Sequence, residues 1–352
     1  YPGTEGERMV LAWLQAQYEA MGLEPGGPNG QWLQPVSLKR YSPVAGSTAA
    51  WTGPDGTSHP LTVGTDITVR AVTNDGRASI QNAPLVFAGH GIHAPERNWN
   101  DYGDLDVRGK VVIVVGGEPD GELFNGPYAT NYQSGAYKAD EAFRRGAIGI
   151  ITLVAGDAAS PMWQGAVRGN GRTRTLTPGA ADLEFSGAIN HDIGAAWAAA
   201  AGLDISRLPN IADGTFKAVA LDGVTLSVEA SETIETLVTH NLLARIPGTE
   251  HPDETIIYSA HWDHVGGVDQ HPTVTGDQIW NGAWDNASGT IGVVEMARQL
   301  SAAPRPKRSI VFAHMAAEEM GLLGAYGYAA DPVYPLETTV ADINIDMLPL
   351  SG

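Results

Sequence analysis

Residues 309–330, SIVFAHMAAEEMGLLGAYGYAA, are the stretch that decides the fold. The apolar run at 309–313 is typical of a buried β-strand, and residues 319–330 predict a helix. Two adjacent acids, Glu318 and Glu319, stand at the junction. The simple explanation is a solvated helix start, where acids interact favourably with the helix dipole. The alternative is that each acid has its own task in one site.

Strands and helices alternate on both sides of this stretch. We predict strands at 242–246, 255–260 and 339–345, and a helix at 288–300. Such alternation is typical of an α/β fold in which helices cover a mostly parallel mixed sheet. Functional residues in these sheets gather at the carboxyl ends of the strands.

The middle of the chain has a pattern of its own. Strand, helix and strand follow one another between residues 111 and 154, which predicts a small β-rich α/β unit with a separate core. We therefore expect residues 71–231 to form an inserted domain. Residues 1–70 and 232–352 would then make up a discontinuous catalytic domain.

Composition and charge exclude several function classes. The 352 residues carry a net charge of −19, which is a poor match for nucleic acid because phosphate binding needs clustered Lys and Arg. The absence of cysteine excludes disulfides, thiolate zinc sites and cysteine nucleophiles. No apolar run approaches the ~18 residues of a membrane helix, so we expect no membrane span.

Imidazole and carboxylate side chains stand where strands or loops are predicted to end. They are His261, Asp285, Glu318, Glu319 and Asp346. Each has an ordinary explanation, such as a surface histidine or a turn aspartate. Asp346 is the hardest to explain in this way, because an unpaired carboxylate at the end of an apolar strand is costly. Together, and without thiolates, these residues suit zinc or another divalent transition metal.

Asp263 supports a metal at His261. It lies two residues further on, and therefore on the same face if the strand continues. Its carboxylate can accept the second imidazole N–H and fix the tautomer, a common support for metal-bound histidine, so we group Asp263 with the catalytic residues. We expect His264, His271 and His314 to be structural.

Four segments in order carry a resemblance: SAHWDHVG, NGAWDNASGT, AAEEMGLLGA and INIDM. The series resembles the co-catalytic di-zinc aminopeptidases, a superfamily that includes bacterial leucyl aminopeptidases and glutamate carboxypeptidase II. The inserted block, especially DYGDLDVRGKVVIVVGG, is similar to a protease-associated domain. The resemblance implies a zinc-dependent exopeptidase, foremost an aminopeptidase that hydrolyses amino-terminal residues from peptides.

The resemblance also implies a role for each residue. His261 and Asp346 would bind one Zn²⁺, Asp285 would bridge two, and Glu319 would bind the second. Glu318 would be the general base that acts on a metal-bridging hydroxide.

The two ends of the chain give further expectations. The family completes the second zinc with a histidine well downstream of INIDM, whereas this chain ends at Gly352. We expect the carboxyl-terminal part of the catalytic domain to be absent, and a fragment that supplies it to be a partner. Because the chain opens with Tyr1 rather than Met, we expect a processed form, secreted or periplasmic.

Two other functions fit the same fold. One is a glutaminyl cyclase-type enzyme, which uses a single zinc. The other is a non-catalytic receptor or scaffold, as in the transferrin receptor branch. The inserted protease-associated-like block favours the peptidase over the cyclase. Scaffolds of this kind are expected to lose metal ligands, whereas this chain keeps every ligand that its length can contain.

Overall fold

The computed structural model describes residues 1–124, 126, 128–176, 183–204, 217–267 and 275–349. The chain divides into two compact units. Unit 1 comprises Tyr1–Arg40, Thr175–Pro178 and Glu235–Gly352, and unit 2 comprises Tyr41–Arg174 and Gly179–Ile234.

We expected the inserted domain to begin at residue 71. Unit 2 begins at residue 41 instead, so residues 41–70 belong to it. Strand pairing gives the reason. Strand β3 (Thr48–Thr52) pairs with β4 (Ser58–Leu61) and with the first part of β13, and β5 (Ile67–Ala71) pairs with β12 (Phe185–Ile189).

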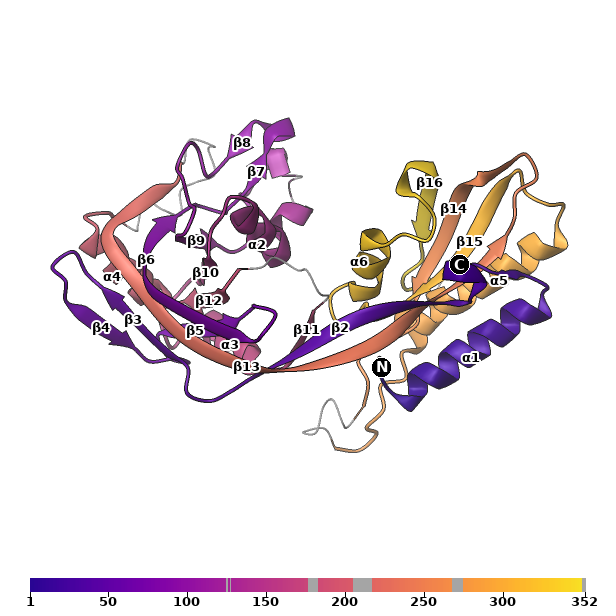
Figure 1. Ribbon diagram of the computed structural model, residues 1–352, viewed down its shortest axis with the longest axis horizontal. Helices are drawn as coiled ribbons and strands as arrows, with labels where there is room; N and C mark the ends of the chain where they lie inside the picture. The colour runs from indigo at the N-terminus through magenta and orange to yellow at the C-terminus, as the bar shows by residue number, and fades with distance from the viewer. Residues whose placement is uncertain (125, 127, 177–182, 205–216, 268–274, 350–352) are drawn as a thin grey trace. The chain divides into compact units, whose positions relative to one another are not determined.

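The sheet of unit 1 has the strand order β16–β14–β15–β13 (Figure 1). Strand β14 runs parallel to both β15 and β16, whereas β13 is antiparallel to β15. Strands β1 and β2 also pair with β13, which passes through both units. The strand bounds are β1 (Glu24–Pro25), β2 (Leu33–Pro43), β13 (Val219–Ile246), β14 (His251–His261), β15 (Arg308–Met315) and β16 (Thr339–Asn344).

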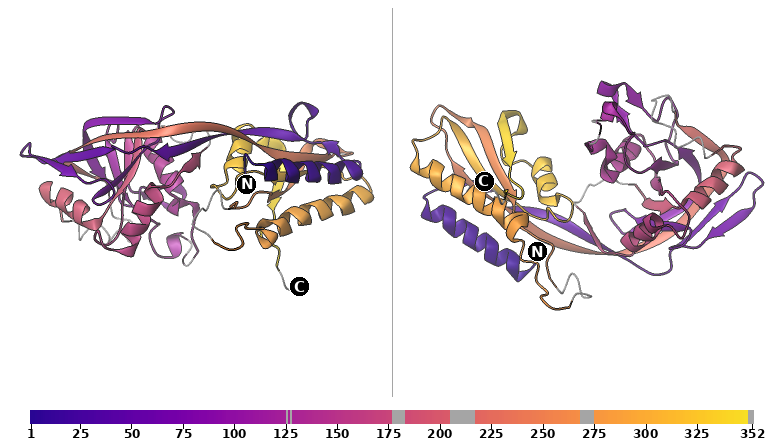
Figure 2. Two further views of the ribbon diagram at one scale, coloured as in Figure 1. Left: turned by 90° about the horizontal axis from the view of Figure 1, so that it is seen from below. Right: turned by 180° about the vertical axis from the view of Figure 1, so that it is seen from behind.

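Helices cover both faces of this sheet. Helices α1 (Glu5–Ala20) and α5 (Gly289–Ala302) lie side by side on one face (Figure 2), and α6 (Leu323–Ala330) packs on the other. Because side chains alternate along a strand, Leu242 of β13 packs toward α1 and α5 while Leu243 packs with α6. The predicted α/β fold with a mostly parallel mixed sheet is confirmed.

The helix that we predicted from residue 319 begins later, at Leu323. Residues 316–322 form a tight turn instead, in which Ala317, Gly321 and Leu322 have positive φ angles. The two adjacent glutamates therefore belong to a turn after β15. The helix-dipole explanation does not apply to them.

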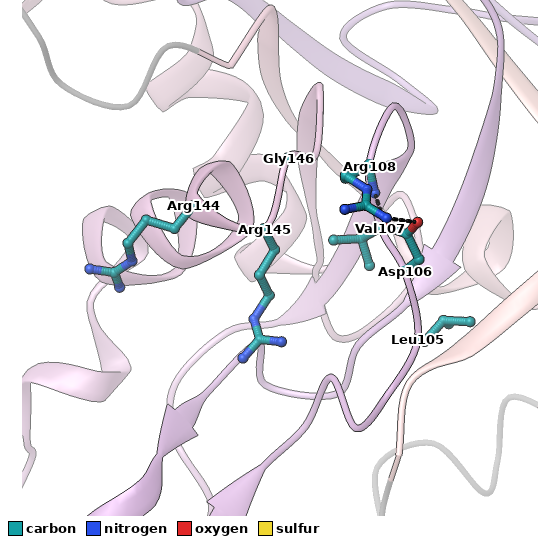
Figure 3. Close-up of a pocket in the computed structure, with 7 residues that line it drawn as sticks. All are labelled: Leu105, Asp106, Val107, Arg108, Arg144, Arg145 and Gly146. Carbon is teal, nitrogen blue, oxygen red and sulfur yellow. Dashed lines mark hydrogen bonds and ion pairs between the residues drawn. The ribbon is translucent and has the colours of Figure 1, made fainter.

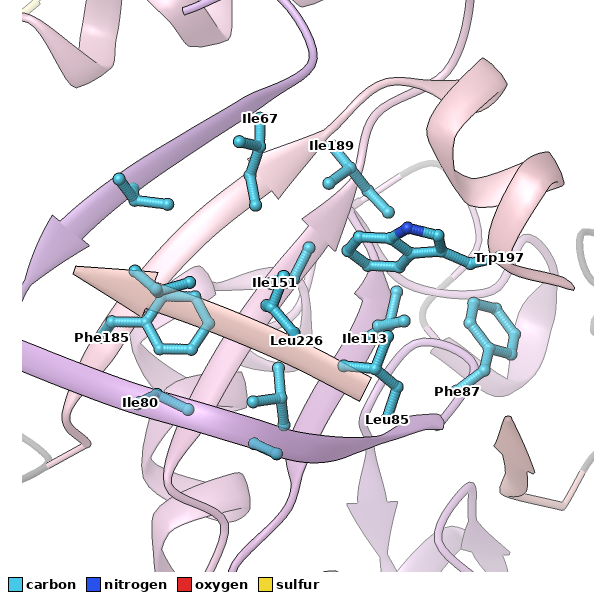
Figure 4. Close-up of a cluster of buried hydrophobic side chains, with 14 of the residues drawn as sticks. Ile67, Ile80, Leu85, Phe87, Ile113, Ile151, Phe185, Ile189, Trp197 and Leu226 are labelled. Atoms are coloured by element: carbon cyan, nitrogen blue, oxygen red, sulfur yellow. The ribbon is translucent and has the colours of Figure 1, made fainter. Parts of the chain in front are cut away.

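Unit 2 has its own sheet, with the order β13–β6–β9–β10–β12–β5. The four strands β6, β9, β10 and β12 are parallel, and their side chains form an apolar core with Trp197 and Phe185 (Figure 4). The remaining bounds are β6 (Arg77–Phe87), β7 (His93–Ala94), β8 (Trp99–Asn100), β9 (Val111–Val115), β10 (Gly149–Leu153), β11 (Arg174–Leu176), α2 (Gly135–Arg144), α3 (Pro161–Asn170) and α4 (His191–Ala200). Within the described ranges, no helix combines the length and the apolar character needed to cross a bilayer.

A buried hydrogen bond joins α1 to the sheet of unit 1. The hydroxyl of Tyr18 lies 2.6 Å from Nε2 of His314, and neither side chain is exposed. Burial lowers the pKa of His314 from 6.5 to about 3, because the charged imidazolium is poorly solvated there. His314 therefore lies in the core, as expected.

His314 should make the folded state sensitive to acid. Since its pKa is lowered on folding, the unfolded state binds a proton below pH 6.5 that the folded state does not, and stability is lost as pH falls. Between pH 7.5 and 5 this costs about 2 kcal/mol. His314→Gln removes this pH-dependent contribution to the free energy of unfolding. In urea unfolding of the metal-free protein, wild type should therefore exceed His314→Gln in stability by about 2 kcal/mol less at pH 5 than at pH 7.5. His251 is exposed, so His251→Gln is the control. A stability difference between wild type and His314→Gln that is the same at both pH values would contradict the prediction.

Candidate active site

The candidate site lies at the carboxyl ends of the three parallel strands of unit 1. The register aligns Ser259 of β14 with Ala313 of β15 and Asn344 of β16, so the chain leaves all three strands at one edge. His261 ends β14, and Asp346 follows β16 by two residues. The turn Ala283–Ser288, just before α5, brings Asp285 to the same edge.

His261 stands at the centre of the first donor set. Its Nε2 lies 3.2 Å from Oδ1 of Asp285, 3.5 Å from Oδ1 of Asp346 and 3.8 Å from Oε2 of Glu318. His261, Asp285 and Asp346 each offer a donor atom, and these atoms lie within 4.8 Å of one another. The structure thus brings together three of the predicted metal ligands.

The hydrogen bonding of His261 tests whether a cation fits. Its Nδ1 donates to the backbone carbonyl of Asp263 at 3.0 Å, so in the neutral ring Nε2 carries a lone pair. Nε2 is buried and has no hydrogen-bond partner among the described residues. A lone pair that faces two carboxylates is favourable only with a cation or proton between them. A divalent metal meets this requirement.

Asp263 supports the site differently from our prediction. Its carboxylate lies 3.9 Å from Nδ1 of His261, and the backbone carbonyl takes the hydrogen bond instead. Asp263 is 2% exposed, and its Oδ1 accepts the backbone N–H of Glu318 at 3.0 Å. Burial raises the pKa of Asp263, and the bond from Glu318 opposes that rise. The side chain therefore links the β14 loop to the turn that carries Glu318.

The adjacent glutamates point to different partners. Glu318 faces His261, whereas Oε1 of Glu319 lies 2.5 Å from Nδ1 of His264. His264, Asp285 and Glu319 form a second set of donor atoms within 4.8 Å of one another. Asp285 belongs to both donor sets.

Negative charge accumulates between the two donor sets. In the described part of the chain, the ion-pair partners of Asp285, Asp346, Glu318 and Glu319 are histidines rather than lysine or arginine. Burial raises the pKa of Glu318, and the neighbouring carboxylates raise it further. Converging carboxylates without a basic counter-charge also fit divalent cations.

Sequence reasoning missed the polar residues that hold these loops together. Asn286 donates to the carbonyl of Ile345 and accepts the N–H groups of Gly289 and Met347, so it joins the Asp285 turn to the Asp346 segment. Thr290 Oγ1 donates to the carbonyl of His261 at 2.8 Å. The only signal in the sequence was their closeness to Asp285, which Asn286 follows directly and Thr290 follows by five residues.

Glycines allow these segments to touch. A Cβ on Gly289 would meet the carbonyl oxygen of Ile345 at 2.4 Å, and one on Gly324 would meet that of Ala316 at 2.2 Å. Asn241 completes the second contact, since it accepts the N–H of Ala316 and donates to the carbonyl of Gly324. The glycines of DNASG and GLLG thus permit close backbone approach.

Other candidate residues lie elsewhere. His271 falls outside the described residues, and His314 is in the core. Unit 2 has a surface pocket lined by Leu105, Asp106, Val107, Arg108, Arg144, Arg145 and Gly146 (Figure 3). Its arginines already pair with carboxylates, Arg108 with Asp106 and the other two with Glu141. The pocket adds no histidine or nucleophile to the candidate site.

Comparison with known proteins agrees with the site. The model of Peptidase family M28 matches residues 241–352. Aminopeptidase NAALADL1 from Mus musculus is 32% identical over 159 residues, which are 43% of this chain and 19% of that protein. A probable zinc metalloprotease from Leptosphaeria maculans is 37% identical over 109 residues, 31% of this chain and 24% of that protein. The chain thus spans 19% to 24% of the length of these curated relatives.

Among solved structures, an aminopeptidase from Aneurinibacillus sp. strain AM-1 aligns with 99% of this chain and 66% of its own, at 20% identity and a TM-score of 0.45. The zinc aminopeptidase BSAP from Bacillus subtilis aligns with 98% of this chain and 64% of its own, at 19% identity and a TM-score of 0.35. The residues that the family model matches include every member of both donor sets. Residues 241–352 thus match the model of peptidase family M28, and the resemblance to the co-catalytic zinc aminopeptidases is confirmed.

Proposed function

We propose that this protein is a zinc-dependent exopeptidase, and specifically an aminopeptidase that removes amino-terminal residues from peptides. The observation that carries the proposal is the buried Nε2 of His261, which faces Asp285 and Asp346 without a partner among the described residues. His261 and Asp346 would hold one zinc ion, Asp285 would hold both, and Glu319 would hold the second. The family match at residues 241–352 and the names of the relatives support zinc and aminopeptidase activity.

Bound zinc lowers the pKa of water to near neutral and polarises a substrate carbonyl. The residues of the chain supply the remaining steps. The carboxylate of Glu318 belongs to neither donor set, yet it reaches the same edge, 3.8 Å from His261. It would take the proton of the attacking water and then pass it to the leaving amine.

The second donor set favours this proposal over a single-zinc cyclase, because a single-metal enzyme does not need a second cluster around Asp285. A receptor or scaffold is also less consistent with the site. All five residues that the resemblance assigns are at one edge of the sheet, and Asp263 and Asn286 hold their loops.

Two further predictions accompany the proposal. We infer that unit 2 is a protease-associated-like domain. Its parallel strands β9 and β10 correspond to the two strands predicted between residues 111 and 154. We also infer that the protein acts outside the cytoplasm, as secreted or periplasmic peptidases do.

Chelation tests the proposed activity. The protein should release free amino acids from short peptides, EDTA should abolish the release, and added Zn²⁺ should restore it. Amino-acid analysis of the reaction measures the products, and an amino-terminally acetylated peptide is the control that an aminopeptidase should not cleave. Release that survives full removal of metal would rule out the proposal.

Substitutions of the two adjacent glutamates should have different effects on metal content and turnover. Glu318→Gln should keep the metal content of the protein but lower turnover by at least ~10²-fold, because it removes the general base. Glu319→Gln should instead lower the occupancy of one metal. Elemental analysis after dialysis, together with peptide hydrolysis, measures both effects. Equal metal content in the two variants would show that the roles are assigned wrongly.

Asp263→Asn removes a buried charge and keeps the backbone carbonyl that binds His261. We expect metal affinity to fall about 10-fold, the lower end of the cost of losing such a supporting residue. Zinc titration against a competing chelator measures the change. Asp277 is exposed, so Asp277→Asn is the control. An unchanged metal affinity in Asp263→Asn would contradict the prediction.

A further inference from the structure

We propose that Asn241, at the site end of β13, is a positioning residue for the reaction. It fixes the turn at residues 316–322, which carries Glu318, by binding the backbone on both sides of that turn. The inference rests on the proposed function, because Glu318 is the residue proposed there as the general base.

Asn241 lies where the backbone pairing of β13 with β15 stops. The last pair of that register is Leu242 with His314, and Asn241 is the next residue of β13. Its side chain is fully buried and continues the pairing: Oδ1 accepts the N–H of Ala316 at 2.9 Å, and Nδ2 donates to the carbonyl of Gly324 at 2.9 Å. A carboxamide can do both because it offers the same acceptor and donor as a peptide group.

The two backbone groups that Asn241 binds form the neck of the turn. The N–H of Gly324 donates to the carbonyl of Ala316 at 2.8 Å, and a Cβ on Gly324 would lie 2.6 Å from Oδ1 of Asn241. Just beyond the neck, Ala317 has a φ of 53°, a conformation that residues with a Cβ rarely adopt. Such a backbone persists only where its surroundings hold it, and Asn241 supplies two of the bonds that do so.

Glu318 follows Ala317 directly, so its place depends on this neck. Its N–H donates to Oδ1 of Asp263 at 3.0 Å, and the turn is therefore held from β13 by Asn241 and from the loop after β14 by Asp263. A general base acts only at the right distance, and a displacement of about 1 Å can lower a rate by ~10²-fold. Because Asn241 is uncharged, its removal changes the geometry of the turn without removing a charge.

The alternative is that Asn241 only stabilises the fold, and Gln34 provides a matched control for that role. Nδ2 of Asn241 also donates to Oε1 of Gln34 at 3.1 Å, and Gln34 donates to the carbonyl of Asp331 at 2.8 Å. Gln34 is 4% exposed. Gln34→Leu therefore removes buried hydrogen bonds of the same network but leaves both bonds from Asn241 to the turn.

The first measurement is hydrogen–deuterium exchange of the whole, metal-free chain, read from peptides that cover residues 314–326. In Asn241→Ala these amides should exchange at least ~10-fold faster than in wild type, since the loss of a buried hydrogen bond favours local opening by about that factor. Asn241→Asp keeps the shape and the acceptor oxygen, so its exchange should be intermediate. It also provides a comparison if the alanine variant does not fold. Gln34→Leu should exchange like wild type in this segment.

The second measurement is peptide hydrolysis with Zn²⁺ in excess, at a temperature where circular dichroism shows every variant to be folded. Asn241→Ala should lose about 10²-fold in kcat with little change in KM, because the base is misplaced while the substrate still binds. Asn241→Asp should lose less, and Gln34→Leu should keep the kcat of wild type. A purely stabilising residue would leave the kcat of the folded protein unchanged.

Either of two results would overturn the proposal: exchange in both Asn241 variants that equals that of wild type, or a kcat in both that equals that of Gln34→Leu. Failure of the proposed function looks different, because wild type itself would then release no amino acids with Zn²⁺ present. The exchange comparison would still decide whether Asn241 fixes the turn.

Discussion

Parallel pairing of β14 with β15 and β16 is the constraint on which the site depends. Parallel strands end at the same edge, so the loops that follow them meet there however far apart they lie in sequence. His261 and Asp346 are separated by 85 positions in the chain, yet the register places the ends of their strands side by side. The buried histidine and the carboxylates around it are a consequence of this pairing.

Backbone contacts then turn neighbouring loops into a defined site. Asn286 and Asn241 each join two loops by satisfying main-chain groups on both, and Gly289 and Gly324 remove the side chains that would keep those loops apart. Buried polar groups of this kind are costly when unpaired, so each asparagine strongly favours one arrangement. These contacts therefore determine how the loops meet at the edge of the sheet.

Much of this architecture could be predicted from the sequence, because hydrophobic period and strand order determine it. The strands of unit 1, helix α5 and the residues that meet at the edge follow from those patterns. The start of α6 was predicted wrongly, because positive φ angles at Ala317 and Leu322 are not encoded by a local preference. The contacts of His264 and Asp263 depend on loops that meet only in the folded chain, and the division near residue 40 depends on distant strand pairing.

The carbonyl of Asp263 has a consequence for what a substitution at this position can change. Every amino acid carries the same backbone carbonyl, so the nitrogen that His261 turns toward its neighbours is determined by the path of the chain. A substitution at position 263 changes the charge next to the amide of Glu318 but leaves the histidine tautomer as it was. The charge next to the Glu318 amide and the orientation of the imidazole are therefore determined by different atoms of the same residue.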